Sequence, residues 1–388
     1  MNQQILYIVI AYCLSAICGA ITIPQIINFC NRKKIYDIPD LRKIHKKSIP
    51  RLGGICFLPS MLLAFLVAII IHNNTFVGKE LQVSLWSVFF FVSLLIIYAA
   101  GIIDDIIGIG PKTKFSFQFV AALLLPISGL YINNLYGFCG IYQIPYIIGA
   151  PLTILVIVFI VNSINLIDGI DGLSASISFI ALTGFLYCFI QAGMVAYSML
   201  ISGMMGVLLP FLYYNIWGDE KKMQKIFMGD SGSLTLGFIL AFLLIKVMMD
   251  NPDVISFSRT SVILAYSLLV VPTYDVVRVS LCRLIHKQPM FKADKNHIHH
   301  KLMRTGLNQH ITLIVIICLA LLFIIVNLTI STFTSLTMIV IVDVLLWLLF
   351  HFTLNKVIAR KGQTVFLPAN EEIIIKDQKA YISVNDYS

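Results

Sequence analysis

Long apolar stretches alternate with short polar segments along most of the chain. Each apolar stretch lasts about 20 residues, the length that an α-helix needs to cross the hydrocarbon core of a bilayer. The pattern therefore predicts an all-α polytopic membrane protein with about eleven transmembrane helices. Their approximate cores are residues 5–29, 52–71, 84–103, 115–132, 148–167, 173–192, 195–214, 233–249, 260–280, 311–332 and 335–354.

The composition agrees with this prediction and excludes an ordinary soluble domain. Hydrophobic residues make up 59% of the 388 positions, charged residues make up 12%, and the mean hydropathy is +0.90. A soluble domain is about half apolar and about a quarter charged. The start of the chain, Met1-Asn2-Gln3-Gln4, carries no basic residue, so we expect no cleavable signal. The eight cysteines form no Cys-x-x-Cys pair, and we expect neither a metal site nor a disulfide framework from them.

The basic residues predict how the chain is oriented in the membrane. Of the 28 Lys and Arg residues, 24 fall in segments that the predicted spans place on one side. This bias assigns that side to the cytoplasm, with the N-terminus outside and the C-terminus inside. It also accounts for the net charge of +9 without nucleic acid as a partner. The segments are residues 30–51, 104–114, 168–172, 215–232, 281–310 and 355–388.

Two segments depart from the helical pattern. Residues 133–147, on the outer side, are rich in aromatic and β-branched residues and favour a short hairpin at the membrane interface. Residues 355–388 form a short cytoplasmic tail, for which both a strand and disorder remain open. Residues 1–354 are then a single transmembrane domain.

A polar stretch between two very apolar runs carries Asn165, Asp168 and Asp171 at every third position. On a helix these side chains would share one side. The stretch could be a plain turn in which the aspartates cap helices. Carboxylates near a bilayer are costly and usually functional, however, and Gly169 and Gly172 would let a ligand approach the backbone. The presence of further acidic and histidine-rich stretches on the same side favours function.

Two more carboxylate motifs lie on the predicted cytoplasmic side. Asp104 and Asp105 end the third predicted span and are followed by Lys112 and Lys114. Adjacent carboxylates repel, so we expect one to be protonated or both to face a cation; a solvated loop pair is the alternative. Asp230 heads a later span between glycine and serine residues. It could be a helix N-cap, or it could hold magnesium while the glycines admit phosphate.

A basic loop contains the cluster His297, His299 and His300, together with Arg283. Three histidines could suggest zinc, but no cysteine accompanies them and the other polar motifs are carboxylates, which favour Mg²⁺. Neighbouring cations disfavour a protonated imidazole. We therefore expect these histidines to hydrogen-bond phosphate or sugar, with simple solvation as the alternative.

Taken together, these motifs resemble those of the polyprenyl-phosphate N-acetylhexosamine-1-phosphate transferases, and most closely the WecA/TagO-like branch, which is related to MraY. The resemblance runs from the first predicted loop to about Asn308. The motifs are D-x-P-x-x-R-K-x-H at 37–45, Gly53-Gly54, Asp104-Asp105, N-x-x-D-G-x-D-G at 165–172, F-M-G-D-x-G-S at 227–233 and D-K-x-H-x-H-H at 294–300.

The resemblance implies transfer of an N-acetylhexosamine 1-phosphate, foremost N-acetylglucosamine 1-phosphate, from a UDP-sugar to undecaprenyl phosphate with release of UMP. It implies Mg²⁺, with Mn²⁺ as an alternative. It places the protein in the bacterial inner (cytoplasmic) membrane with its active site facing the cytoplasm, at the first membrane step of a cell-envelope polysaccharide pathway such as that of lipopolysaccharide or O-antigen. Residues 1–354 become a glycosyl-1-phosphate transferase domain, and a homodimer is compatible with the resemblance.

The resemblance also implies roles for individual residues. Asp230 would be the main metal ligand, with Asn165 and Asp168 beside it. The catalytic set would be Asp104, Asp105, Asp168, Asp171 and His297. The substrate-binding residues would be Phe227, stacked on uracil, and His45, Lys46, Lys112, Lys114, Arg283, His299 and His300.

Other functions remain as alternatives. An ion-coupled transporter would place its charges near the membrane midplane and often shows internal repeats, whereas here the charges lie at span ends and no repeat is evident. A CDP-alcohol phosphatidyltransferase would carry Asp-Gly-x-x-Ala-Arg, but Ser176 stands where that arginine is expected. Within the resembling family the alternative is a phospho-MurNAc-pentapeptide transferase, which the His-Ile-His-His spacing disfavours. Direct attack by the lipid phosphate and a two-step route through an aspartate both remain open.

Overall fold

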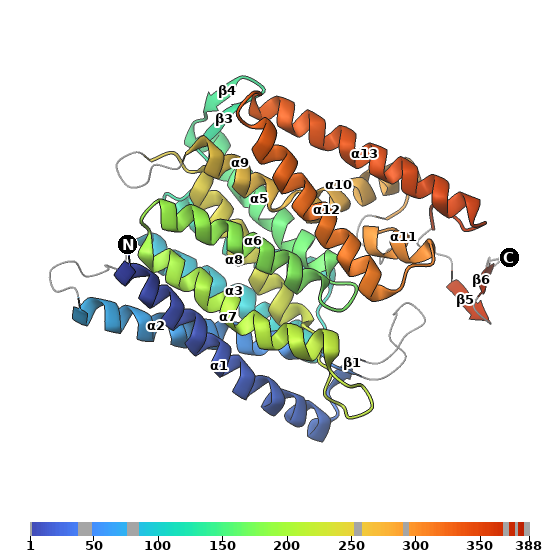
Figure 1. Ribbon diagram of the computed structural model, residues 1–388, viewed down its shortest axis with the longest axis horizontal. Coiled ribbons are helices and arrows are strands. Elements are labelled where there is room, and N and C mark those ends of the chain that lie inside the picture. Colours follow the sequence, from blue (N-terminus) through green and yellow to red (C-terminus); the bar gives the residue numbers. More distant parts are fainter. Residues whose placement is uncertain are drawn as a thin grey trace.

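Long helices make up most of the computed structural model (Figure 1), which describes residues 2–37, 49–75, 85–251, 258–289, 295–367, 372–376 and 379–383. The helices are α1 (Asn2–Lys33), η1 (Gly53–Cys56), α2 (Phe57–Thr75), α3 (Leu85–Ile107), α4 (Pro111–Ile127), α5 (Tyr146–Ile167), α6 (Leu173–Gln191), α7 (Val195–Trp217), α8 (Gly229–Met248), α9 (Arg259–Ser267), α10 (Val270–Ile285), α11 (Ile298–Arg304), α12 (Gln309–Ile330) and α13 (Leu336–Arg360). Three antiparallel strand pairs accompany them: β1 (Tyr36–Asp37) with β2 (Ile49–Pro50), β3 (Asn134–Phe138) with β4 (Ile141–Gln143), and β5 (Glu372–Lys376) with β6 (Lys379–Ser383).

Within the described residues, nine helices are long and apolar enough to cross a membrane, or ten if the bent pair α9–α10 counts as one span. The prediction of a polytopic helical membrane protein is therefore confirmed. The remaining predicted span falls on α4, which has 17 residues and so lies at the short end of the range of about 17–25 residues for a crossing helix. Helix α13 runs to Arg360, beyond the predicted end of the last span at residue 354.

The span predicted at residues 260–280 is not a single straight helix. The structure has two helices there, α9 and α10, which are bent by 53° relative to each other. Pro272 lies in the first turn of α10. It has no N–H to donate to the carbonyl of Leu268, four residues earlier, and its ring clashes with that carbonyl, so a straight helix cannot continue through this point.

The predicted hairpin within residues 133–147 is confirmed as the β3–β4 pair. The preceding helix, α4, is shifted toward the N-terminus relative to the predicted span at 115–132. Pro111 occupies its first turn, where a missing N–H costs nothing, and Gly129, at φ +89°, follows its end in the left-handed conformation. These two residues set the helix bounds where hydropathy alone did not.

Helix α8 is the central helix of the bundle. It packs against α3 and α5, and 89% of its most apolar stretch is buried. Its first turn meets the glycine pair that precedes α2, because a Cβ on Gly54 would lie 2.1 Å from the backbone nitrogen of Gly232. Only glycine allows this approach. The beginning of α8 is thereby fixed among the ends of its neighbours.

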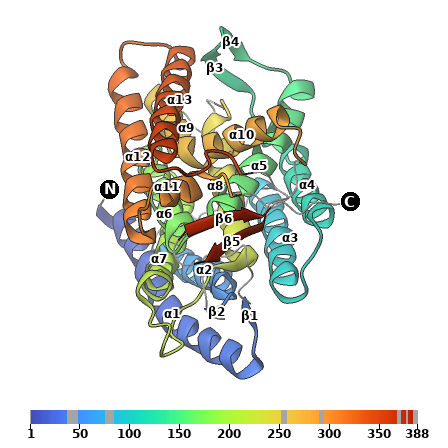
Figure 2. The ribbon, with the colours of Figure 1, turned by 90° about the vertical axis from the view of Figure 1, so that its right-hand side faces the viewer.

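The polar segments predicted to share one side of the membrane meet at one end of the bundle. Gly53 N donates to Phe227 O over 2.9 Å, and Arg51 Nε donates to Asp105 O over 2.8 Å. Leu367 N donates to the side chain of Asn296 over 3.0 Å, which ties the segment after α13 to the segment that carries His297, His299 and His300, called here the histidine loop. This end, with β1, α11 and the β5–β6 hairpin, lies to the right in Figure 1 and faces the viewer in Figure 2.

Candidate active site

Asp105 holds the first turn of α8 in place. Its carboxylate oxygens accept hydrogen bonds from Asp230 N over 2.8 Å and from Ser231 N over 2.9 Å. Gly229 precedes them at φ +73°, and a Cβ there would lie 2.6 Å from the Asp105 carboxylate. Asp105 thus accepts hydrogen bonds from two N–H groups that have no partner inside the helix. Both of its oxygens are occupied by the protein's own backbone.

The Asp230 carboxylate is surrounded by polar side chains from three other helices. The Asn165 amide of α5 donates to Asp230 Oδ1 and, over 2.8 Å, to Ser233 Oγ. The Lys114 ammonium of α4 lies 3.2 Å from Asp230 Oδ2 and also pairs with the Asp104 carboxylate of α3. We call Asp104, Asp168, Asp230, Asn165 and Lys114 the carboxylate cluster. The structure therefore unites residues that are up to 126 positions apart in the sequence.

Asp104 differs from its neighbour Asp105 because only one of its oxygens is bound by the backbone. Oδ1 accepts a hydrogen bond from Ile109 N over 2.7 Å, whereas Oδ2 faces Lys114. Arg51 donates to the carbonyls of both aspartates and so fixes the end of α3. Of these two adjacent aspartates, Asp104 therefore points into the carboxylate cluster, whereas Asp105 supports the beginning of α8.

Asp168 ends α5 and completes the negative side of the cluster. Burial, followed by the nearby charges of Asp230, Asp171 and Asp105, raises the pKa of Asp168 to about 8. Like charges in a confined space disfavour ionisation, and a bound cation would reverse that effect. The cluster is therefore suited to a positively charged ligand.

The donor set of the carboxylate cluster fits Mg²⁺. Carboxylate and amide oxygens are hard ligands, and Mg²⁺ is usually held by one or two carboxylates together with water and substrate phosphates. Within the described ranges, His, Cys, Asp and Glu side chains form no group of three or more that could hold a metal by themselves. Asp230 and Asn165, two predicted metal ligands, are in direct contact, and Asp168 lies close to them.

Asp171, a predicted catalytic residue, is engaged in an ion pair that the sequence did not suggest. Lys225, from the segment before α8, lies 2.7 Å from Asp171 and 3.2 Å from Glu220. Burial alone would lower the pKa of Lys225, but the two carboxylates outweigh it and raise that pKa. The pair therefore stays charged and joins the loop after α5 to the loop after α7.

The same two loops are joined a second time by Asn215, near the end of α7. Its side-chain oxygen accepts a hydrogen bond from Gly172 N over 2.6 Å, and its amide donates to Ile226 O over 2.8 Å. Because both ends of the side chain bind backbone, Asn215 positions the loops that carry Asp171 and Phe227. In the linear sequence, nothing indicated this role except a polar residue at the end of a predicted span.

The histidine loop is oriented by Asp275 of α10. His297 Nδ1 lies 2.8 Å from Asp275 Oδ2, while Asp275 Oδ1 accepts from Ile298 N over 3.0 Å and from Arg278 Nη2 over 2.8 Å. A carboxylate bound to one ring nitrogen fixes the tautomer of an imidazole and directs its other nitrogen outward. Asp275 was not predicted as a site residue, although it is a carboxylate at the end of a span on the same side.

His299 brings the histidine loop against the polar stretch that follows α5. A Cβ on Gly169 would lie 2.1 Å from His299 Nε2, and the rings of His297 and His299 are stacked with centroids 6.0 Å apart. His300 lies next to them, 4.3 Å from His299 between ring centroids. Burial, followed by the charges of His300 and His297, lowers the pKa of His299 well below its usual range. The ring is therefore neutral at physiological pH.

The other predicted substrate-binding residues have different surroundings. Phe227 is half-buried, and its backbone pairs with Pro50 and Gly53. Arg283 is buried and donates to Pro289 O over 3.3 Å. Lys112 is exposed at the start of α4, outside the cluster that Lys114 joins. His45 and Lys46 lie outside the described residues.

Comparisons with known proteins point to the same family as the sequence motifs. The sequence model of glycosyl transferase family 4 matches residues 85–248, which include Asp104, Asp168 and Asp230. A Bacillus subtilis relative, named a probable undecaprenyl-phosphate N-acetylglucosaminyl 1-phosphate transferase, is 28% identical over 83% of this chain and 85% of its own.

Two further relatives are named undecaprenyl-phosphate alpha-N-acetylglucosaminyl 1-phosphate transferase. The Yersinia pestis protein is 24% identical over 70% of both chains. The Pasteurella multocida protein is 27% identical over 71% of this chain and 73% of its own. The resemblance found in the motifs therefore extends over most of the sequence.

Proposed function

We propose that the chain is a member of the WecA/TagO-like polyprenyl-phosphate N-acetylhexosamine-1-phosphate transferases, which its motifs and its relatives support, and that it transfers N-acetylglucosamine 1-phosphate from UDP-N-acetylglucosamine to undecaprenyl phosphate. The new bond joins an oxygen of the lipid phosphate to the phosphorus that bears the sugar. The bond that breaks joins this phosphorus to the bridging oxygen, which leaves with UMP. The product would begin a cell-envelope polysaccharide.

The observation that carries the proposal is the carboxylate cluster at the beginning of α8. Two phosphate-bearing substrates repel each other, so their reaction needs positive charge placed between them. Asp230, Asn165 and Asp168 fit Mg²⁺, which when bound would polarise the phosphoryl oxygens and offset their charge. Lys114 adds a fixed cation to the same place, 3.2 Å from Asp230.

Asp104 and Lys114 are suited to the lipid phosphate. Asp104 keeps one oxygen turned toward the cluster, and its pairing with Lys114 favours the ionised carboxylate. An ionised carboxylate can take a proton from a phosphate oxygen before that oxygen attacks. This role does not depend on whether the phosphate attacks the UDP-sugar directly or after an aspartate has taken up the phospho-sugar.

The histidine loop is suited to the diphosphate or the sugar. His297 is held through Nδ1 by Asp275, which leaves Nε2 to meet a substrate oxygen. His299 lies against the backbone of Gly169 and so places the loop beside the polar stretch that carries Asp168. The site lies at one end of the bundle and not at its midplane, where transporters bind their substrates, which favours an enzyme.

We place the site on the cytoplasmic side of a bacterial inner membrane, where UDP-sugars are found, because most Lys and Arg residues lie at that end. The test uses a protein without its native cysteines and with one new cysteine, Tyr142→Cys or Lys287→Cys, both exposed positions. An impermeant maleimide should label Tyr142→Cys in intact cells and Lys287→Cys only after permeabilisation. The reverse pattern would refute the proposed orientation.

The activity itself is tested by exchange of labelled UMP into UDP-sugars. Purified protein with undecaprenyl phosphate and Mg²⁺ should exchange label into UDP-N-acetylglucosamine much faster than into UDP-N-acetylgalactosamine or UDP-MurNAc-pentapeptide. A reaction without undecaprenyl phosphate is the control. If the lipid phosphate attacks the UDP-sugar directly, this control should show no exchange of label. Exchange into UDP-MurNAc-pentapeptide alone would assign the other activity of the family, and no exchange with any UDP-sugar would refute the proposal.

A further inference from the structure

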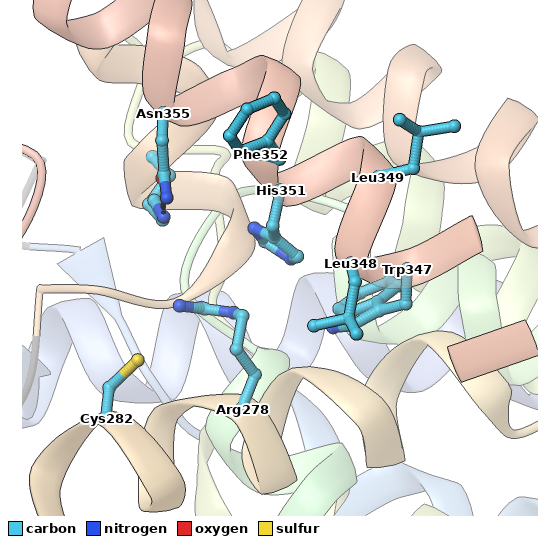
Figure 3. Close-up of a pocket in the computed structure, with 9 residues that line it drawn as sticks. Arg278, Cys282, Trp347, Leu348, Leu349, His351, Phe352 and Asn355 are labelled. Atoms are coloured by element: carbon cyan, nitrogen blue, oxygen red, sulfur yellow. Dashed lines mark hydrogen bonds between the residues drawn. The ribbon is translucent and has the colours of Figure 1, made fainter. Parts of the chain in front are cut away.

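A cavity of about 540 Å³ opens between α10, α11 and α13 (Figure 3). None of its lining residues belongs to the carboxylate cluster, and the function proposed above does not use it. It is lined by Arg278, Cys282, Lys301, Trp347, Leu348, Leu349, His351, Phe352 and Asn355.

The cavity contains polar groups that lack hydrogen-bond partners. His351 is 5% exposed, and neither of its ring nitrogens is hydrogen-bonded to any described residue. Arg278 Nε and Trp347 Nε1 likewise have no acceptor in the described parts of the chain. Figure 3 shows the side chains of Arg278 and His351 pointing toward one another across the cavity. Buried donors without acceptors are costly, so this arrangement favours a ligand rich in acceptor oxygens.

The charge around the cavity is positive. Lys301 is 4% exposed, and its ammonium donates to the side-chain oxygen of Asn355. Burial, followed by the charges of Arg278 and Arg304, lowers the pKa of Lys301 to about 8. The Asp275 carboxylate also faces this group, but it is shared between Arg278 and His297. An anion in the cavity would therefore relieve repulsion between its cations.

The mouth of the cavity is apolar and belongs to a helix that can cross a membrane. Leu348, Leu349 and Phe352 of α13 are 58%, 61% and 56% exposed. Asn355 and Lys301 lie near the end of the bundle that carries the candidate active site, and we infer that the cations lie at the depth of lipid headgroups. A ligand that combines an anionic head with an apolar chain matches both parts of the cavity.

We propose that this cavity binds an anionic membrane phospholipid of the phosphatidylglycerol type. Its phosphate accepts hydrogen bonds from Arg278, Lys301 and His351, and one acyl chain lies along the apolar side of α13. A free phosphate would gain nothing from the leucines and phenylalanine at the mouth. The acceptor lipid of the proposed reaction must reach the carboxylate cluster, which shares no residue with this cavity.

A phospholipid bound here would also stabilise the histidine loop. Arg278 lines the cavity, donates to Asp275 Oδ1 over 2.8 Å and donates to Asn296 O over 2.5 Å. Asp275 in turn holds His297. A phosphate that fixes the Arg278 guanidinium would thus restrain the loop that carries His297, without touching it.

The test measures retained lipid by native mass spectrometry of the full chain, purified in detergent and supplied with defined lipids. Wild-type protein should retain one phosphatidylglycerol in preference to phosphatidylcholine. Lys301→Gln and His351→Leu should reduce that retention at least about tenfold, since each removes a donor to the phosphate. Lys33→Gln is the matched control. It removes an exposed charge at the C-terminal end of α1, away from the cavity, and should behave as wild type.

Several outcomes would overturn the proposal. They are equal retention of phosphatidylglycerol and phosphatidylcholine, retention by Lys301→Gln equal to that of wild type, and displacement of phosphatidylglycerol by equimolar undecaprenyl phosphate or by inorganic phosphate. Lys301→Gln keeps an amide that can still bond Asn355, so the comparison stands even if His351→Leu does not fold. Thermal unfolding in detergent should show stabilisation by phosphatidylglycerol in wild type and not in Lys301→Gln.

Discussion

Carboxylates lie at the beginnings of both α8 and α11, but the two regions differ in how fully the protein supplies hydrogen-bond donors to those carboxylates. At α11, Asp275 lies between His297, Ile298 N and Arg278, so each carboxylate oxygen has a donor. At α8, Asp230 and Asp104 share a single ammonium, that of Lys114. The Asp275 carboxylate therefore needs no ligand, whereas the carboxylates at α8 have an excess of negative charge.

This difference separates positioning from chemistry. A carboxylate whose oxygens are all bound by the protein can hold a structure but has little left for a substrate or a metal. Asp105 illustrates this within the α8 region, because both of its oxygens accept backbone N–H groups, whereas its neighbour Asp104 keeps one oxygen facing the cluster. Adjacency in sequence therefore says little about which of two aspartates acts on substrate.

The largest effect is expected for Asp230→Asn, which removes the charge at the centre of the unsatisfied region. Transfer should fall by at least about 10²–10³-fold, the range for losing one group that stabilises a transition state. The UMP-exchange assay measures it, and thermal unfolding in detergent should show a folded protein. Asp219→Asn, in the loop before α8, serves as control and should keep full activity. Near-normal exchange in Asp230→Asn would refute the assignment of Asp230 as a metal ligand.

The adjacent residues Asp104 and Asp105 give the sharpest test of the difference between a carboxylate that acts on substrate and one that holds the structure. Asp104→Asn should lose activity strongly and unfold near the wild-type temperature. Asp105→Asn should unfold at a lower temperature, because it leaves an N–H of α8 without its acceptor, at a cost of about 1–3 kcal/mol. Its activity should fall less than that of Asp104→Asn. Equal stability of the two variants would show that Asp105 does not hold the beginning of α8.

In the histidine loop, the residue that meets substrate should matter more than the residue that orients it. His297→Ala should cut turnover or raise the KM for the UDP-sugar while bound metal stays unchanged. Asp275→Asn should show a weaker form of the same defect, because it leaves the imidazole in place but loosens its orientation. Activity should survive a zinc-selective chelator and stop when magnesium is withdrawn. Stoichiometric zinc lost together with activity in His297→Ala would contradict this.

The smallest effect is on the pH dependence of stability. Because burial and His300 and His297 lower the pKa of His299, the folded protein binds fewer protons there than the unfolded chain. Its contribution is therefore present above the unfolded pKa of about 6.5 and is lost as the pH falls below it. His299→Asn should flatten the fall in unfolding temperature between about pH 7 and pH 5, whereas the exposed His310→Asn should not. A flat profile in the wild type would refute the assignment.

The features that follow from local pattern were predictable from the sequence. Runs of about 20 apolar residues predict spans, since a helix of about that length crosses the bilayer core. The bias of Lys and Arg groups the polar loops at one end, and the motifs around Asp104, Asn165, Asp230 and His297 indicate the family. Each of these signals is read from the order of residues along the chain, so it needs no knowledge of packing.

Only the tertiary structure decided which polar groups meet. The pairs Asp171–Lys225 and Asp275–His297 join segments that are 54 and 22 positions apart, and the two oxygens of Asp105 bind N–H groups 125 and 126 positions away. Whether such groups satisfy one another depends on how helix ends pack, and the linear pattern does not contain that information. The same holds for the cavity beside α13, because its cations come from α10 and α11 and its apolar mouth from a third helix.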